Sequence, residues 1–240
     1  MDIPHLSRAP IVEALLDIRV EPTVDSTSLE ALKSQLGQTF PKVRPMQELR
    51  VGLASDETNV GRRSNGFEFR DSADHWAAQT RPNGFSISRI NGYESWQELR
   101  DKARGLWNVY RTAASPKRVV RTAVRYVNRM DLELPIGDLG HFFALEVRTP
   151  AALPASMSEL LVRSVIPFES EGSSCIVTML VQPVKPEDTS ASVVLDIDVF
   201  IQNELDAHSD EVWDRLEQHR SVKNKVFYAI VKEELWRRYQ

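Results

Sequence analysis

The 240-residue sequence predicts an α+β fold: a tandem pseudo-repeat of a β-α-β(3-4)-α unit, with a curved antiparallel sheet and helices on one face. Three observations support this prediction. Alternating apolar residues mark strands in both halves of the chain. Amphipathic helix patterns accompany these strands, and a similar order of elements occurs twice. We therefore expect two halves, residues 1–115 and 116–240, that share one sheet as a single compact domain.

The first half begins with a predicted strand at residues 10–20, in which apolar side chains alternate with Glu13, Asp17 and Arg19. A short helix at 28–38 follows, because its leucines recur at helical spacing. The prolines of FPKVRP then end the helix, since proline lacks an N–H donor and disfavours helix before it. Four short strands, separated by turns such as NVGRRSNG and RPNG, are expected at 48–54, 65–71, 74–80 and 84–90.

A helix that begins after Ser95 completes this half. Glu98 lies three residues after Ser95, which is the capping-box spacing, so each side chain can bond a free amide at the helix start. Trp96, Leu99 and Ala103 begin the apolar stripe of this helix.

The central strand, at residues 117–134, is the longest strand signal in the chain. Arg121, Arg125 and Arg129 alternate with apolar residues on one face, whereas the other face is apolar except for Asn128. Three arginines on one face of a central strand require either partners within the protein or a ligand.

The second half repeats the order of the first. A short helix near 138–146 and a proline-containing connection follow the central strand. Strands are expected at 157–168, 173–184 and 191–202, and a long helix at 209–239.

Two alignments of the halves support an internal duplication. A shift of 117 residues places Trp96 on Trp213, in the closing helix of each half. A shift of 108 places Asp17 on Arg125, and because 108 is even the two strands keep the same face. The second half offers three clear strands where the first offers four.

This order of elements resembles the TATA-binding-protein-like architecture, in which two such halves share one long curved sheet and their first strands meet. The resemblance implies that the first strand and the central strand are neighbours. Glu13 and Asp17 would then lie across from Arg121 and Arg125.

Four motifs resemble a sporadically distributed family of bacterial proteins of unknown function: PIVEA at 10–14, FSISRINGYESW at 85–96, VRYVNRMDL at 124–132 and VVLDIDVF at 193–200. The resemblance covers almost the whole chain. It implies carriage on mobile elements, as for toxin–antidote or phage-defence genes, and no particular activity. The residues at the motif positions are Glu13, Arg89, Tyr93, Trp96, Arg125, Tyr126, Asn128, Arg129, Asp196 and Asp198.

The candidate binding site is a set of polar residues assigned to the open face of the sheet: Glu13, Asp17, Arg121, Arg125, Asn128, Arg129, Asp196 and Asp198. One interpretation is a cross-strand network of ion pairs, each of which contributes about 0.2–1 kcal/mol when exposed. The other is a charged groove in which forked arginine donors grip an anionic ligand or an acidic segment of a partner.

Asp196 and Asp198 point to the same side of their strand, and paired carboxylates can hold Mg²⁺ or act in acid–base catalysis. This pattern alone is weak, however. The five histidines are dispersed, and the P-loop, GxGxxG and GxSxG motifs do not occur. We therefore expect no catalytic residue, metal or cofactor, and we expect the aspartates to pair with arginines of the central strand.

Further candidates for contacts with macromolecules are two tryptophans and four basic residues. Trp107 and Trp236 are interface candidates, because aromatic residues are enriched at protein interfaces. The nucleic-acid candidates are Arg62, Arg63, Lys117 and Arg118. Nucleic-acid binding is disfavoured by a net charge of −4 and by acids that balance the arginines of the open face.

Composition and termini predict a soluble cytoplasmic protein. Apolar residues make up 42% and charged residues 27% of the chain, and no apolar run approaches the roughly 20 residues of a membrane span. The N-terminus lacks a signal-peptide pattern. The single cysteine, Cys175, lies in an apolar strand pattern and is expected to be buried and unreactive.

The sequence thus predicts a non-catalytic interaction protein that binds a protein partner, or forms a homodimer, through a helix face or a sheet edge. The alternative is a nucleic-acid-binding module that uses the four basic residues named above. A metal-dependent enzyme that uses Asp196 and Asp198 is the third candidate.

Overall fold

Long alternating segments of the sequence form the strands of a large antiparallel sheet in the computed structural model, which describes residues 4, 6–54, 57–134, 136, 138–145, 147, 152, 159–183, 185 and 187–240. For residues 26, 48–54 and 57–64 only the backbone is described. These residues contain ten strands and four α-helices, and the sheet does not close on itself. The predicted α+β class is confirmed.

In chain order, the strands and α-helices are β1 (Ile11–Glu21), α1 (Ser26–Leu36), β2 (Lys42–Ala54), β3 (Glu57–Arg70), β4 (Trp76–Arg81), β5 (Gly84–Ile90), α2 (Trp96–Ala114), β6 (Arg118–Glu133), β7 (Leu160–Phe168), β8 (Ser173–Val181), β9 (Ser190–Ile201), β10 (Leu205–Asp206), α3 (Glu211–Ile230) and α4 (Glu233–Trp236).

Contacts between residues divide the chain into two units, each of which is discontinuous in sequence. Unit 1 comprises Met1–Ala14, Ala123–Ile201 and Asp214–Gln240. Unit 2 comprises Leu15–Thr122 and Gln202–Trp213. The elements β1, β6 and α3 therefore contribute residues to both units.

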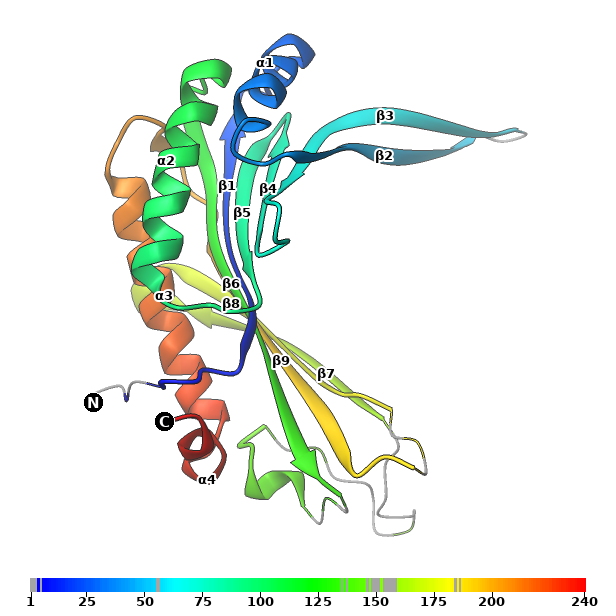
Figure 1. The fold of residues 1–240 in the computed structure, drawn as a ribbon, viewed down its shortest axis with the longest axis vertical. Helices are drawn as coiled ribbons and strands as arrows, with labels where there is room; N and C mark the ends of the chain where they lie inside the picture. Colours follow the sequence, from blue (N-terminus) through cyan, green and yellow to red (C-terminus); the bar gives the residue numbers. More distant parts are fainter. Residues whose placement is uncertain are drawn as a thin grey trace. The chain divides into compact units, whose positions relative to one another are not determined.

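In unit 2 the strands follow the order β2-β3-β4-β5-β1-β6, and β10 pairs with β6. Helices α1 and α2 lie side by side along this sheet (Figure 1). Leu16 of β1 is fully buried, as are the rings of Phe85, Trp107 and Tyr110, which contact one another. Because side chains alternate along a strand, Asp17 is presented on the opposite face of β1 from Leu16.

In unit 1 the strands follow the order β6-β9-β8-β7. Every second residue of β8 and β9 is buried, as the alternating pattern predicts. Cys175 is among these residues, and burial raises the pKa of its thiol to about 12. The predicted burial of Cys175 is confirmed.

Strand boundaries differ from the predictions where glycine and proline occur inside strands. The segment NVGRRSNG is not a turn but part of β3, and β2 begins at Lys42 and continues through Pro45. Proline is tolerated there because β2 stands at one end of the strand order and its register shifts between Pro45 and Gln47. At Gly66 of β3, opposite this irregularity, φ is +102°, a conformation that favours glycine.

Two helix predictions also need correction. Among the described residues of 138–146 the structure shows only a 3₁₀ turn, Leu139–His141, which Asp138 caps by accepting from the Gly140 N–H. The predicted helix 209–239 ends at Ile230, and the short helix α4 follows after a bridge between Val231 and Phe143. Across the described residues, no helix is long and apolar enough to cross a membrane.

Candidate functional site

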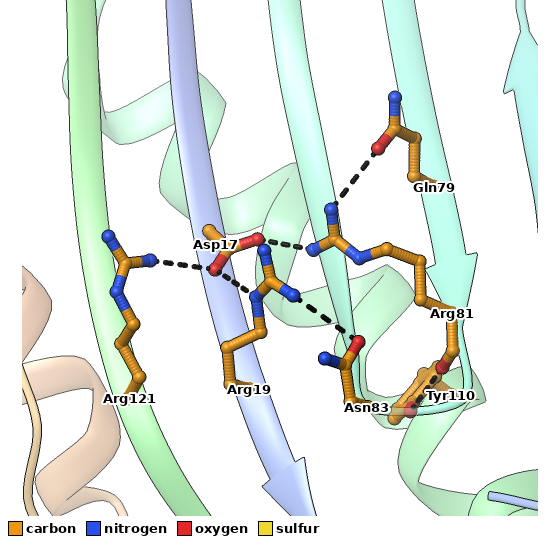
Figure 2. Close-up of polar contacts among 7 residues, drawn as sticks. All are labelled: Asp17, Arg19, Gln79, Arg81, Asn83, Tyr110 and Arg121. Atoms are coloured by element: carbon orange, nitrogen blue, oxygen red, sulfur yellow. Dashed lines mark hydrogen bonds and ion pairs between the residues drawn. The ribbon is translucent and has the colours of Figure 1, made fainter. Parts of the chain in front are cut away.

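Asp17 is the centre of a cluster of arginines on the face of unit 2 opposite α1 and α2 (Figure 2). One of its carboxylate oxygens accepts from Arg19 Nε at 2.9 Å and from Arg121 Nη1 at 3.0 Å, and the other accepts from Arg81 Nη2. The Asp17 side chain is only 7% exposed, whereas those of Arg19 and Arg121 are 33% and 22% exposed. We refer to this site as the Asp17 cluster, which consists of Asp17, Arg19, Gln79, Arg81, Asn83 and Arg121.

Arg81 is the most deeply buried arginine of the cluster, with a side chain that is 12% exposed. Its Nη1 donates to Gln79 Oε1 at 3.2 Å, and its backbone carbonyl accepts from the Tyr110 hydroxyl at 3.2 Å. Burial lowers the pKa of Arg81, the Asp17 carboxylate opposes this effect, and the nearby Arg19 charge adds to it. Burial also raises the pKa of Tyr110, so its hydroxyl stays protonated and keeps donating.

The sequence does not predict Arg19, Gln79, Arg81 and Asn83 as site residues. Arg19 lies two residues after Asp17, so strand alternation alone places it on the same face. Arg81 and Asn83 belong to RPNG, which the sequence predicts only as a turn. The turn does form, and the β4–β5 pairing that it sets, with Arg81 opposite Gly84, brings the Arg81 side chain to the cluster.

In unit 1, Arg125 pairs with Asp196 through two forked bonds, Nε to Oδ1 at 2.9 Å and Nη2 to Oδ2 at 2.7 Å. The bonds to Asp196 raise the pKa of Arg125, and the negative charges of Glu13 and Asp198 add to this effect. Arg129 donates to the Ser192 hydroxyl at 2.9 Å. Arg125 and Asp196, two of the candidate binding residues, thus form an ion pair.

Asn128 does not belong to the open face. It is 2% exposed and donates from Nδ2 to the backbone carbonyl of Leu195 at 3.1 Å. Its position in the strand gives it the same side as the buried Tyr126 and Met130, opposite to Arg125. Asn128 is therefore a buried polar residue whose hydrogen bond satisfies a β9 carbonyl.

Asp196 and Asp198 are the residues that the sequence offers as candidate metal ligands. Within the part of the chain that is described, no group of three or more His, Cys, Asp or Glu side chains is arranged to hold a metal ion. Both oxygens of Asp196 accept from Arg125.

Trp107 is not available as an interface anchor, which corrects that prediction. It is 1% exposed, and its ring stacks on Tyr110 with a centroid distance of 5.5 Å. The helix stripe of α2 buries this ring although polar residues flank it in sequence. Trp236 is partly exposed and meets Tyr228 edge-on at 5.8 Å, and its role at an interface remains a prediction.

Of the four nucleic-acid candidates, the structure describes the side chains of Lys117 and Arg118 only. The side chains of Arg62 and Arg63 lie outside the described part of the chain. Arg118 donates to Glu204 at 2.9 Å and lies 3.8 Å from Glu21, so acids neutralise its charge. Lys117 is exposed and directly precedes β6.

The edge strand β7 carries most of the exposed apolar side chains of the described residues. Leu161 is 65% exposed, Val165 57% and Ile166 37%, and the remaining large exposed apolar residue is Val147. All nine residues of β7 pair with β8 in unbroken register, and β7 is the last strand of the order. Sequence reasoning missed this surface because an apolar alternating strand is normally buried on one face.

Lys223 of α3 is an unusual cation within unit 1. Its ammonium lies 4.0 Å above the centre of the Tyr126 ring. Burial, with a smaller contribution from the Arg220 charge, lowers the pKa of Lys223 to about 7. The ring stabilises the charged form through a cation–π contact, and burial opposes it.

Comparison of the chain with models of known protein families finds no match, and comparison with curated proteins finds none either.

Proposed function

We propose that this chain is a non-catalytic interaction protein that binds an extended segment of a partner protein along β7. The observation that supports the proposal is the exposure of Leu161, Val165 and Ile166 on a strand at the end of the sheet. Exposed apolar patches on soluble proteins commonly mark interaction sites.

The backbone of β7 favours a strand as the bound element. Its inner edge is fully paired with β8, and among the described residues no strand pairs with its outer edge. Native edge strands are usually protected by charges, bulges or prolines. β7 has one charge, Arg163, no register shift, and a proline only at its penultimate residue. A partner strand would use the free N–H and C=O groups for hydrogen bonds.

Charge indicates the chemistry of this partner. Arg163 lies on the same face as Leu161 and Val165 and opposite Thr178 of β8. An acidic residue between two apolar residues in the partner would match this pattern. Full-length antiparallel pairing of two copies of β7 would instead place the two Arg163 side chains diagonally adjacent. We therefore favour an unlike partner over a homodimer.

A fluorescent synthetic peptide as long as β7, with alternating valine and threonine and a central glutamate, tests this proposal. We expect it to bind the chain and to lose affinity when Val165→Lys places a charge in the apolar row. Arg163→Glu should reverse the preference towards a peptide with a central lysine, by about two- to fivefold for each charge pair.

Lys185→Glu, which reverses an exposed charge on the β8–β9 loop, is the matched control and should leave peptide affinity unchanged. A peptide affinity that neither β7 substitution changes would contradict the proposed site. Self-association that Val165→Lys abolishes would show that a second copy is the occupant.

We also propose that the chain is a tandem duplication with a TATA-binding-protein-like architecture, with halves at 1–115 and 116–240. Strand order supports this. In the sheet order of the first half, β5, β4 and β3 lie in turn beyond β1. In that of the second half, β9, β8 and β7 lie in turn beyond β6. In each half the first strand thus lies beside the last long one. In chain order the 3₁₀ turn at Leu139–His141 follows β6, as α1 follows β1.

The motif resemblance leads us to propose membership of the sporadic bacterial family, with the partner encoded beside this chain on a mobile or defence element and binding it in the cytoplasm. Co-expression with the products of adjacent genes should yield a complex that resists salt. DNA affinity that falls steeply with salt would instead indicate the nucleic-acid module. Stabilisation by Mg²⁺ that Asp198→Asn removes would indicate the enzyme.

A further inference from the structure

The Asp17 cluster carries more positive charge than its carboxylate neutralises. Without counting Arg121, Arg19 and Arg81 carry two positive charges, whereas Asp17 carries one negative charge. These two arginines also donate to the side-chain oxygens of Asn83 and Gln79, at 3.3 Å and 3.2 Å, which belong to neutral amides. Amide oxygens offer only partial negative charge, so an anion would be stabilised beside these guanidinium groups.

The cluster also has more hydrogen-bond donors than acceptors. Arginine only donates, so Gln79 and Asn83 turn their oxygens towards Arg81 and Arg19, and each amide retains its NH₂ donors. Arg81 Nε is buried, and no described residue accepts from it. A ligand that accepts several hydrogen bonds at once fits this arrangement.

Burial increases the benefit of an additional anion. The Arg81 side chain is largely removed from water, and a buried charge without a matched counter-charge destabilises a fold. Arg19 is more exposed and lies beside Asp17, so it can contact a molecule that arrives from solvent (Figure 2).

We propose that the Asp17 cluster binds a phosphate group, with Arg19 as the charged donor and the amides of Gln79 and Asn83 as neutral ones. A phosphate presents three strong acceptor oxygens, whereas a carboxylate presents two. Arginine suits this role because its planar fork matches phosphate oxygens. The site lies in unit 2 and is independent of the proposed peptide site on β7.

Thermal unfolding and isothermal titration calorimetry with sodium phosphate, compared with sodium chloride at equal ionic strength, test this proposal. We expect phosphate to raise the melting temperature more than chloride does. Arg19→Gln removes the most exposed of the three arginines and should weaken phosphate binding about tenfold, as expected for a charge-assisted hydrogen bond.

Arg118→Gln is the matched control, because Arg118 is an arginine of unit 2 that acids already neutralise. It should keep the full phosphate response. Asp17→Asn should strengthen phosphate binding, since it removes the competing carboxylate. An equal response to phosphate and chloride, or a phosphate affinity that is unchanged in Arg19→Gln, overturns the proposal.

The source of the phosphate group is resolved by a parallel titration with a nucleoside monophosphate. Binding of either probe that depends on Arg19 supports the site. Tighter binding of the nucleoside monophosphate identifies a phosphomonoester as the ligand, whereas equal affinity indicates recognition of the phosphate group alone.

Discussion

At the scale of single residues, Asp17 is the carboxylate on which several arginine charges of unit 2 converge. Three guanidinium groups donate to its two oxygens, and it is nearly inaccessible to water. Removing one partner of a buried charge network leaves the others uncompensated. Asp17 is therefore expected to contribute much more to stability than a surface ion pair does.

Asp17→Ala should destabilise the protein by about 3 kcal/mol, the cost of uncompensated buried charge. Urea unfolding measures this change. Asp210→Ala serves as the control, because Asp210 also pairs with an arginine, Arg104, but is 82% exposed. It should change stability by less than about 1 kcal/mol. Equal effects of both substitutions would show that burial of Asp17 does not strengthen its role.

Lys223 makes a second prediction at this scale, on pH dependence. Burial lowers its pKa in the folded protein from 10.5 to about 7. Between these values the unfolded chain binds more protons, so stability contributed at Lys223 rises with pH. Below pH 7 the amine is charged in both states and the full cost of burying that charge remains.

Lys223→Met removes this titration. Relative to the variant, the native protein should therefore gain stability between about pH 7 and pH 10, as measured by urea midpoints at several pH values. Parallel stability profiles of the two proteins would contradict a lowered pKa at Lys223.

At the scale of secondary structure, two glycines have opposite effects on stability. A Cβ added at Gly66 of β3 would lie 1.8 Å from the Thr80 carbonyl oxygen of β4, and φ there is +102°. A Cβ added at Gly105 of α2 would have no neighbour within 4 Å. The first glycine permits close strand pairing, whereas the second only weakens a helix.

Gly66→Ala should destabilise the protein by about 1–3 kcal/mol through backbone strain, and the clash with Thr80 should add to this cost. Gly105→Ala should stabilise it by about 0.5–1 kcal/mol, because alanine loses less backbone entropy in a helix. Thermal unfolding of both variants tests the pair. A stabilising Gly66→Ala would mean that the β3–β4 contact is not formed as described.

At the scale of the whole molecule, the compact units do not coincide with the two halves of the sequence. Unit 2 includes residues 202–213, from the end of the chain, as well as Leu15–Thr122. Within it the Ala207 N–H bonds the Lys117 carbonyl at 3.2 Å, and Arg104 lies over the Trp213 ring at 5.5 Å. The C-terminal part of the chain thus completes a unit that the N-terminal part begins.

A fragment of residues 1–115 should therefore fail to fold cooperatively. It lacks β6, which pairs with β1 in unit 2, and it lacks the residues that contact Arg104 and α2. Circular dichroism during urea titration checks this expectation against the full chain. A sharp transition in the fragment would show that the first half is an autonomous folding unit.

The sequence by itself determined the α+β class, most strand positions and the start of α2. These features depend on local rules: alternation gives β1, β6, β8 and β9, and Ser95 accepts from the Glu98 N–H at 3.1 Å to start α2. The same rules placed Asp17 on one face of β1. Helix 138–146 was wrong because a few apolar residues at helical spacing do not outweigh a tertiary contact such as the Phe143 bridge to Val231.

Only the tertiary structure decided which charges meet and which apolar residues stay exposed. Arg81 lies 64 residues from Asp17, and Asp196 lies 71 from Arg125, so their pairing depends on strand order and register. Trp107 is buried and Leu161 exposed although both are strongly apolar, because burial depends on what packs against an element. Local sequence sets the conformation of a segment, but contacts between distant segments create its binding surfaces.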